Sequence, residues 1–371
     1  MTEELAQKYY YQKLSAEEQK YYKEILKGLE DMETVIHVST ADDNGNCQKV
    51  FEYIMYDMRT LFWCDRSWSG SKYLSENRTE ISPGYTCTKA ERDVRQNQVD
   101  EAVGQCLSGI DKDADDYTKI KAVFEYLVNT VDYDKNAADN QNVYSALVGK
   151  RSVCAGYARS TQLLLEKLGI QCLYVEGTAG ENNEAHAWNI VKCNGKYYQI
   201  DTTWGDPIYD QTENPETNAG NNINYDYLCT SDEKMYRNHT IKAVTDYPVC
   251  DSDNLNYFKL NNMYYESYDA ATLMEKMKES YQKKKILSPV NFQIRMYMHR
   301  RERISSIIFS HRHPRGWHNI MASAGYGTAI QNIRSITESQ SIGSISNTPE
   351  TEIYKMSGSK GLKPRVLAHW W

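Results

Sequence analysis

The chain has 371 residues, 40% of them hydrophobic and 25% charged, a composition typical of a globular protein with enough apolar residues for a buried core. Its net charge of -7 argues against nucleic acid as the default partner, and no apolar run approaches the length of a membrane span. The nine cysteines include no pair spaced CxxC, so we expect no metal site and no cofactor.

The first 32 residues predict two helices, because apolar and tyrosine side chains recur there at helical spacing. Ser15 followed by Glu18 forms a capping-box pattern, which places the junction of the two helices near Leu14. The N-terminus has neither the basic nor the apolar region of a signal peptide. The chain as written is therefore expected in the cytoplasm, whereas an incomplete N-terminus would favour a secreted or cell-surface protein.

Residues 34–88 predict a small antiparallel sheet, because short β-rich segments alternate there with turn residues. The expected strands are VIHVST (35–40), VFEYIMYD (50–57), TLFWCD (60–65) and ISPGYTC (81–87). Two helices are then expected over residues 91–108 and 115–130, the second with an apolar stripe.

A polar loop before Cys154 carries Gln141 and Tyr144, together with two asparagines. Such side chains can donate hydrogen bonds to an oxyanion, and they can equally hydrogen-bond their own turns. We keep Gln141 and Tyr144 as candidate oxyanion or substrate-binding residues.

Cys154 is predicted to open a helix that runs to Gly169, a plausible residue for the left-handed position after the helix end. At a helix N-terminus, unpaired N–H groups and the helix dipole stabilise a thiolate and can also receive an oxyanion. Ala155 and Gly156 leave room for a substrate. The alternative is a cysteine that serves only as a small buried hydrophobic residue.

His186 begins the predicted strand AHAWNIV, and Asp201 lies at the end of the predicted strand KYYQIDTTW. Asn194-Gly195 between them is the strongest short hairpin signal, and it brings both residues to the same end of a two-stranded ribbon. An imidazole there can take the thiol proton, while the carboxylate fixes its tautomer. Each residue also has a purely structural alternative. His186 could be a hydrogen-bonded strand histidine without a catalytic role, and Asp201 could form the turn at the end of its strand. Trp188 and Trp204 share the ribbon and could either wall a substrate channel or pack in the core.

The ordered motifs C-A-G-Y-A, H-A-W-N and D-T-T-W-G-D-P resemble the transglutaminase-like superfamily of papain-type folds, specifically its bacterial members. The resemblance covers roughly residues 115–207. It implies an α+β fold in which the helix bearing cysteine packs on an antiparallel sheet bearing histidine and aspartate. It also implies a Cys-His-Asp catalytic triad, which maps onto Cys154, His186 and Asp201. The sequence before Cys154 does not match the tryptophan that stabilises the oxyanion in the animal enzymes.

The resemblance implies attack on an amide through a thioester, in a protein or peptide substrate that could be a cell-wall peptide. Water or an amine then resolves the thioester, so hydrolysis and transamidation both stay open. The alternative is a catalytically silent module that uses the Tyr-rich N-terminal region to bind cell-wall glycan or peptide; the chain has 30 tyrosines against six phenylalanines. We expect no nucleic-acid or membrane partner, and the sequence leaves the oligomeric state open.

The remaining sequence falls into three compositional segments. Residues 207–228 are a polar loop and candidate lid, and residues 257–285 predict a hairpin followed by a charged helix. From Ser288 there are 11 Lys and Arg against four Glu and no Asp, a net charge of +7 that leaves -14 on residues 1–287. One hypothesis for this segment is a flexible basic tail, and the other is a shifted reading frame after the lysine run 283–285. The expected organisation is an N-terminal region (1–90), a catalytic core (91–250), an accessory element (251–287) and the atypical tail (288–371).

Overall fold

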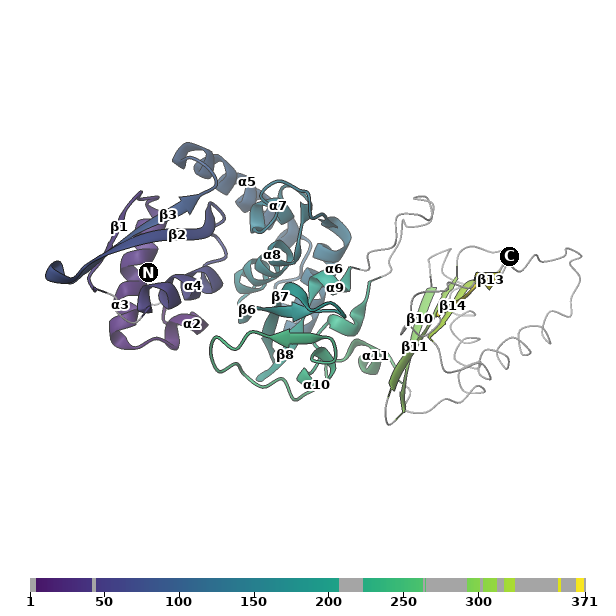
Figure 1. The fold of residues 1–371 in the computed structure, drawn as a ribbon. Coiled ribbons are helices and arrows are strands. Elements are labelled where there is room, and N and C mark those ends of the chain that lie inside the picture. The colour runs from purple at the N-terminus through teal and green to yellow at the C-terminus, as the bar shows by residue number, and fades with distance from the viewer. Residues whose placement is uncertain are drawn as a thin grey trace, which may run out of the picture. The chain divides into compact units, whose positions relative to one another are not determined.

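The structure is a computed structural model that describes residues 5–41, 45–206, 223–262 and 264, and the backbone of five strands between residues 292 and 369. The chain divides into two units (Figure 1). The first comprises Met1–Glu213 and Ile223–Asn256, and the second comprises Asn214–Asn222 and Tyr257–Trp371. The candidate site lies within the first unit.

The N-terminal helices are α2 (Tyr9–Gln12) and α3 (Ala16–Glu30). They meet at Leu14, and the predicted capping box is confirmed. The Glu18 amide donates to Ser15 Oγ at 3.2 Å, and the Ser15 amide donates to Glu18 Oε2 at 2.8 Å. Both reciprocal bonds satisfy N–H groups that a helix start would otherwise leave unpaired.

The N-terminal sheet has three antiparallel strands in the order β1-β3-β2. They are β1 (Ile36–Val38), β2 (Cys64–Tyr73) and β3 (Arg78–Tyr85), with a short 3-10 turn η1 (Leu74–Glu76) between the last two. The strand predicted over residues 50–57 is wrong, because this segment forms most of helix α4 (Asn46–Asp57). Nearly every residue of this part of α4 is buried, so its continuous apolar run carries no period that separates helix from strand.

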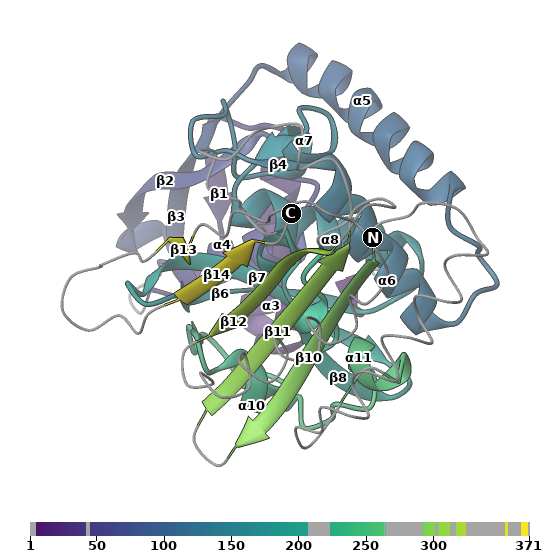
Figure 2. The same cartoon turned by 90° about the vertical axis from the view of Figure 1, so that its right-hand side faces the viewer.

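The two helices that follow are confirmed as α5 (Lys89–Ser108) and α6 (Asp116–Thr130). A second capping box at Thr88 and Glu91 starts α5, which is the long helix at the edge of Figure 2. The predicted stripe of α6 is buried, and α6 packs against the helix that begins at Cys154.

The core contains helix α8 (Cys154–Lys167) on an antiparallel sheet with the order β8-β7-β6-β9 (Figure 1). The strands are β6 (Cys172–Ala179), β7 (Glu184–Cys193), β8 (Lys196–Ile200) and β9 (His239–Ile241). Asn189 of β7 donates to the Ala158 carbonyl of α8 at 3.0 Å, which ties helix to sheet. The predicted α+β architecture, with the cysteine on a helix that packs on this sheet, is confirmed.

Short elements complete the first unit. A parallel pair joins β4 (Asp132–Tyr133) to β5 (Arg151–Ser152) on either side of α7 (Val143–Leu147). After the sheet come α9 (Thr202–Gly205), η3 (Tyr225–Tyr227) and α10 (Asp232–Met235). Among the residues that the structure describes, no helix is both long enough and apolar enough to cross a membrane.

In the second unit, α11 (Tyr257–Leu260) replaces the start of the predicted hairpin, so a strand there is wrong. Five strands form a sheet in the order β10-β11-β12-β14-β13. They are β10 (Phe292–Arg300), β11 (Arg303–His311), β12 (Trp317–Ser323), β13 (Ile353–Tyr354) and β14 (Arg365–His369). Residues 207–222 of the candidate lid (207–228) and the charged helix before residue 285 lie outside the described residues, while the end of the lid segment contains η3. The flexible basic tail and the shifted reading frame both stay predictions for residues 288–371.

Candidate active site

Cys154 is the first residue of α8, as predicted. Val153 before it is extended, and Gly169 after the helix has a φ of +79°. The Ile170 amide donates to the Leu165 carbonyl at 2.9 Å, the backbone bond that closes a helix at a left-handed glycine. The thiol is partly exposed at the end of the helix where unpaired N–H groups and the dipole favour an anion.

Gly156 does not make room for a substrate, and that expectation is wrong. A Cβ at this position would lie 1.9 Å from Ser152 Oγ and 2.9 Å from the Asn142 carbonyl oxygen. The absent side chain therefore lets the start of α8 pack directly on the loop before it. Ser152 Oγ also donates to the Asn140 carbonyl at 2.7 Å, so this contact fixes the backbone that carries Cys154.

The hairpin that joins β7 to β8 places His186 and Asp201 together. Asn194 and Gly195 have φ values of +50° and +77°, which are the left-handed values of the predicted two-residue turn. Asn189 pairs with Ile200, so Asp201 and His186 project from the same face near one end of the ribbon. His186 Nε2 lies 2.7 Å from Asp201 Oδ2, and the predicted Asp–His hydrogen bond is present.

The Asp201 carboxylate is completely buried, and each of its oxygens accepts two hydrogen bonds. Oδ1 accepts from the amides of Thr203 at 2.9 Å and Trp204 at 3.1 Å, so Asp201 is also the N-cap of α9. Oδ2 accepts from His186 and from His239, whose Nε2 lies 3.1 Å away. Burial raises the pKa of Asp201, but the charge of His186 and these hydrogen bonds outweigh it and hold the pKa well below its usual range.

His186 is 9% exposed and lies between Asp201 and Cys154. Because Nε2 contacts Asp201, Nδ1 is the ring nitrogen available to Cys154. Burial lowers the pKa of His186, but the Asp201 carboxylate and then the hydrogen bond with Cys154 raise it above the ordinary value. The imidazolium form is therefore the favoured partner of a thiolate.

His239 is the residue of this cluster that the sequence did not reveal. It begins β9, which pairs with β6 so that His239 lies opposite Ala179. The only sequence signal is a histidine before a short β-branched pair, and a long polar segment separates it from Asp201. The ligand atoms of His186, Asp201 and His239 lie within 4.8 Å of one another, but both imidazoles are already hydrogen-bonded to Asp201.

The two tryptophans occupy different environments. Trp188 is fully buried, stacks on His186 with ring centroids 5.9 Å apart, and donates to Gln199 Oε1 at 2.8 Å. It therefore packs in the core beneath the site and does not wall a substrate channel. Trp204 is only partly buried and lies with its ring edge-to-face against His186, 6.1 Å between centroids.

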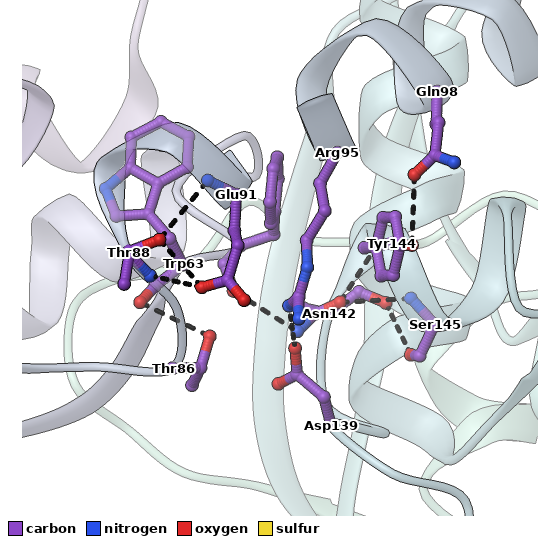
Figure 3. A network of polar contacts seen from close by, with 11 residues as sticks. Trp63, Thr86, Thr88, Glu91, Arg95, Gln98, Asp139, Asn142, Tyr144 and Ser145 are labelled. Atoms are coloured by element: carbon purple, nitrogen blue, oxygen red, sulfur yellow. Dashed lines mark hydrogen bonds and ion pairs between the residues drawn. The ribbon is translucent and has the colours of Figure 1, made fainter. Parts of the chain in front are cut away.

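Tyr144 and Gln141 make contacts away from the triad. The Tyr144 hydroxyl donates to Gln98 Oε1 on α5 at 3.0 Å, and Arg95 lies over its ring (Figure 3). Gln141 donates to Asn140 Oδ1 at 3.4 Å and lines a cavity of about 560 Å³ with Arg59 and Arg159. The described lining of that cavity includes no triad residue, so we assign neither side chain to the oxyanion.

A second cavity, of about 400 Å³, opens beside His186 and Trp204. Its lining also includes Tyr133, Glu181, Glu184 and Asp206. Burial and then the charges of Cys154, Glu184 and Asp201 raise the pKa of Tyr133 to about 12, so its hydroxyl keeps its proton at neutral pH. Tyr133 is a further residue that the sequence reasoning passed over, since it sits in a short acidic stretch with no motif.

Comparison with known proteins gives a match between residues 105–202 and the model of the transglutaminase-like superfamily. Among curated proteins, kyphoscoliosis peptidase of Mus musculus is 24% identical over 140 residues, covering 33% of this chain and 21% of the relative. The Homo sapiens protein is 23% identical over 184 residues, covering 46% and 27%. The chain thus matches only about a fifth to a quarter of the length of these relatives.

Among solved structures, a TGase has 15% identity and a TM-score of 0.28, covering 41% of this chain and 47% of its own. A candidate cysteine protease from Cytophaga hutchinsonii has 16% identity and a TM-score of 0.25, covering 37% and 61%. The segment matched by the family model contains Cys154, His186 and Asp201. The similarity to the transglutaminase-like superfamily is therefore shown for residues 105–202, about a quarter of the chain.

Proposed function

We propose that this chain is a thiol enzyme that attacks an amide of a protein or peptide and forms a thioester on Cys154. The observation that carries the proposal is the 2.7 Å contact between His186 Nε2 and a fully buried Asp201, beside a cysteine at a helix N-terminus. The names of the compared proteins, a peptidase, a TGase and a cysteine protease, agree with this class of chemistry.

In the proposed reaction, the Cys154 thiolate adds to the amide carbonyl carbon while His186 holds the thiol proton on Nδ1. The tetrahedral intermediate then collapses: the carbon–nitrogen bond breaks, and His186 gives its proton to the leaving amine. Water or a second amine next attacks the thioester and passes a proton to His186. The carbon–sulfur bond breaks, and the thiolate and imidazolium are restored.

Two groups are suited to stabilise the oxyanion. Gly156 and Tyr157 already donate to the Val153 carbonyl, so the free amides at the start of α8 are those of Cys154 and Ala155. Tyr133 lines the cavity beside His186 and keeps its hydroxyl proton, so it is our candidate side-chain donor in place of Tyr144. Trp204 would form one wall of the same cavity.

Whether water or an amine resolves the thioester is part of the proposal to be tested, as are a cell-wall peptide substrate and the compartment. The test is incubation with glutamine-containing peptides, with and without a primary amine, followed by mass spectrometry. Shorter peptide products indicate hydrolysis of a backbone peptide bond. A gain of one mass unit indicates deamidation of glutamine, and a gain equal to the added amine indicates transamidation.

Cys154→Ala should abolish every product, whereas Cys87→Ala should retain them, because Cys87 is the other partly exposed cysteine of the described residues. Iodoacetamide at neutral pH should alkylate Cys154 much faster than Cys87 in the same molecule. Equal alkylation rates together with no product from any peptide would contradict the proposal and favour the silent binding module.

A further inference from the structure

We infer that His239 is a positioning residue that shares Asp201 Oδ2 with His186 and thereby weakens the hold of the His186–Asp201 pair on its proton. The catalytic role of His239 rests on the proposed function. Its effect on the proton affinity of the buried His186–Asp201 pair does not.

The position of His239 is fixed by the sheet and by the rings around it. Its side chain is fully buried, and its Nε2 lies 3.1 Å from Asp201 Oδ2. Its ring centroid lies 4.8 Å from that of Trp204 and 5.1 Å from that of Trp188. The imidazole therefore has no freedom to turn away from the carboxylate.

The second ring nitrogen of His239 is held by a short polar chain. Nδ1 lies 2.7 Å from Asn238 Oδ1, and Asn238 Nδ2 donates to the Tyr227 hydroxyl at 2.8 Å. Because an amide presents an oxygen or a nitrogen when it is turned over, Asn238 can satisfy Nδ1 whether or not this atom carries a proton. A carboxylate oxygen only accepts, so Nε2 must be protonated and must donate to Asp201.

This second donor acts on the proton affinity of the pair. When His186 is neutral, Asp201 carries an uncompensated charge, and the His239 N–H stabilises it strongly. When His186 is an imidazolium, Oδ2 is already partly neutralised, and the same N–H stabilises it less. Removing His239 must therefore raise the proton affinity of the pair, wherever the proton resides within it.

Under the proposed mechanism, the lower proton affinity that His239 gives the His186–Asp201 pair favours catalysis. His186 must release its proton to a leaving amine and later take a proton back, which works best when its pKa lies near the operating pH. A buried carboxylate with one donor fewer would keep the imidazolium protonated too firmly. His239 offsets that tendency without touching the substrate.

The charged and titratable groups near the cluster come from several other places in the fold. They are Cys154 on α8, Tyr133 on β4, Tyr227 on η3, and the charged residues that line the cavity beside His186, namely Lys135, Glu181, Glu184 and Asp206. Cys154 is the one that hydrogen-bonds with His186, so we replace it in the experiment. The others are kept unchanged in every variant.

The test uses the full chain with Cys154→Ala and ring-labelled histidine, and follows the His186 resonance by NMR across neutral and alkaline pH. The His186 signal is the one that disappears in Cys154→Ala/His186→Gln. Into the Cys154→Ala background we introduce His239→Met, which keeps approximate size without a donor, and His239→Gln, whose Nε2 can replace the lost donor.

We expect His239→Met to raise the His186 midpoint by about one pH unit, a roughly tenfold change typical of one hydrogen bond to a buried charge. His239→Gln should restore most of the original midpoint. If the variant merely disordered the site, His186 would lose Asp201 and its midpoint would fall toward the ordinary value of about 6.5. An unchanged or lowered midpoint would overturn the inference.

The readout does not require catalysis. If peptides yield no product but His239→Met raises the midpoint, the proposed function fails and the inference about the pair stands. If products form but the midpoint does not rise, the inference alone fails.

Discussion

The pH dependence of stability offers a direct measure of the His186–Asp201 pair. The perturbation is His186→Gln in the Cys154→Ala background, which removes one titrating ring and leaves the hairpin intact. Cys154 is replaced so that its thiol, which is hydrogen-bonded to His186, does not enter the comparison. The two variants then differ only in whether residue 186 titrates.

The sign follows from the raised pKa of His186 in the folded protein, caused by Asp201 against the opposing effect of burial. Between the unfolded value of about 6.5 and the higher folded value, the folded protein binds one proton more than the unfolded chain. The contribution of His186 is therefore complete below pH 6.5 and is lost as the pH rises. The slope is about 1.4 kcal/mol per pH unit, so the free-energy difference between the variants should fall by roughly that amount from pH 7 to pH 8.

The assay is urea unfolding of both variants at each pH, followed by tryptophan fluorescence and linear extrapolation. Four of the seven tryptophans lie in the unit that contains the site, and Trp188 among them stacks on His186, so unfolding of this unit contributes to the signal. A constant difference between the two variants across this range would refute the reasoning, because it would mean that Asp201 does not bias His186 toward its charged form.

Four further substitutions test the packing and capping of the first unit. Gly156→Ala should destabilise the protein by about 1–3 kcal/mol through contact with Ser152, whereas Gly104→Ala, in an open position of α5, should stabilise it by about 0.5–1 kcal/mol in the same denaturation assay; equal effects would contradict the packing argument. Tyr144→Phe should leave kcat/KM for the peptide reaction unchanged, because its hydroxyl serves Gln98, and a clear loss would return Tyr144 to the oxyanion. Ser15→Ala should cost about 1 kcal/mol of unfolding free energy by removing the capping bond, and a negligible loss in thermal or urea unfolding would count against it.

Much of the core was predictable because its signals are local. The helix that starts at Cys154 ends at a left-handed glycine, and the Asn194-Gly195 turn sets the pairing of two adjacent strands. Both features depend on residues close in sequence. The relation of His186 to Asp201 followed from counting outward from that turn.

Two of the missed features have clear physical causes. The sequence predicts a strand over residues 50–57 because an almost fully buried helix shows no amphipathic period. His239 was missed because its place beside Asp201 depends on β9 pairing with β6, which are far apart in the chain. A contact made by such pairing leaves no spacing to count.

The two-residue turn at Asn194 and Gly195 also determines which residues of the two strands face each other. His186 lies eight residues before Asn194 and Asp201 six after Gly195, and the strand pairing converts these counts into the 2.7 Å contact. Because strand side chains alternate between faces, deleting one residue from β8 would turn residue 201 to the opposite side. In evolutionary terms, related chains that keep the chemistry should lack single insertions or deletions in either strand and at the turn that sets their pairing.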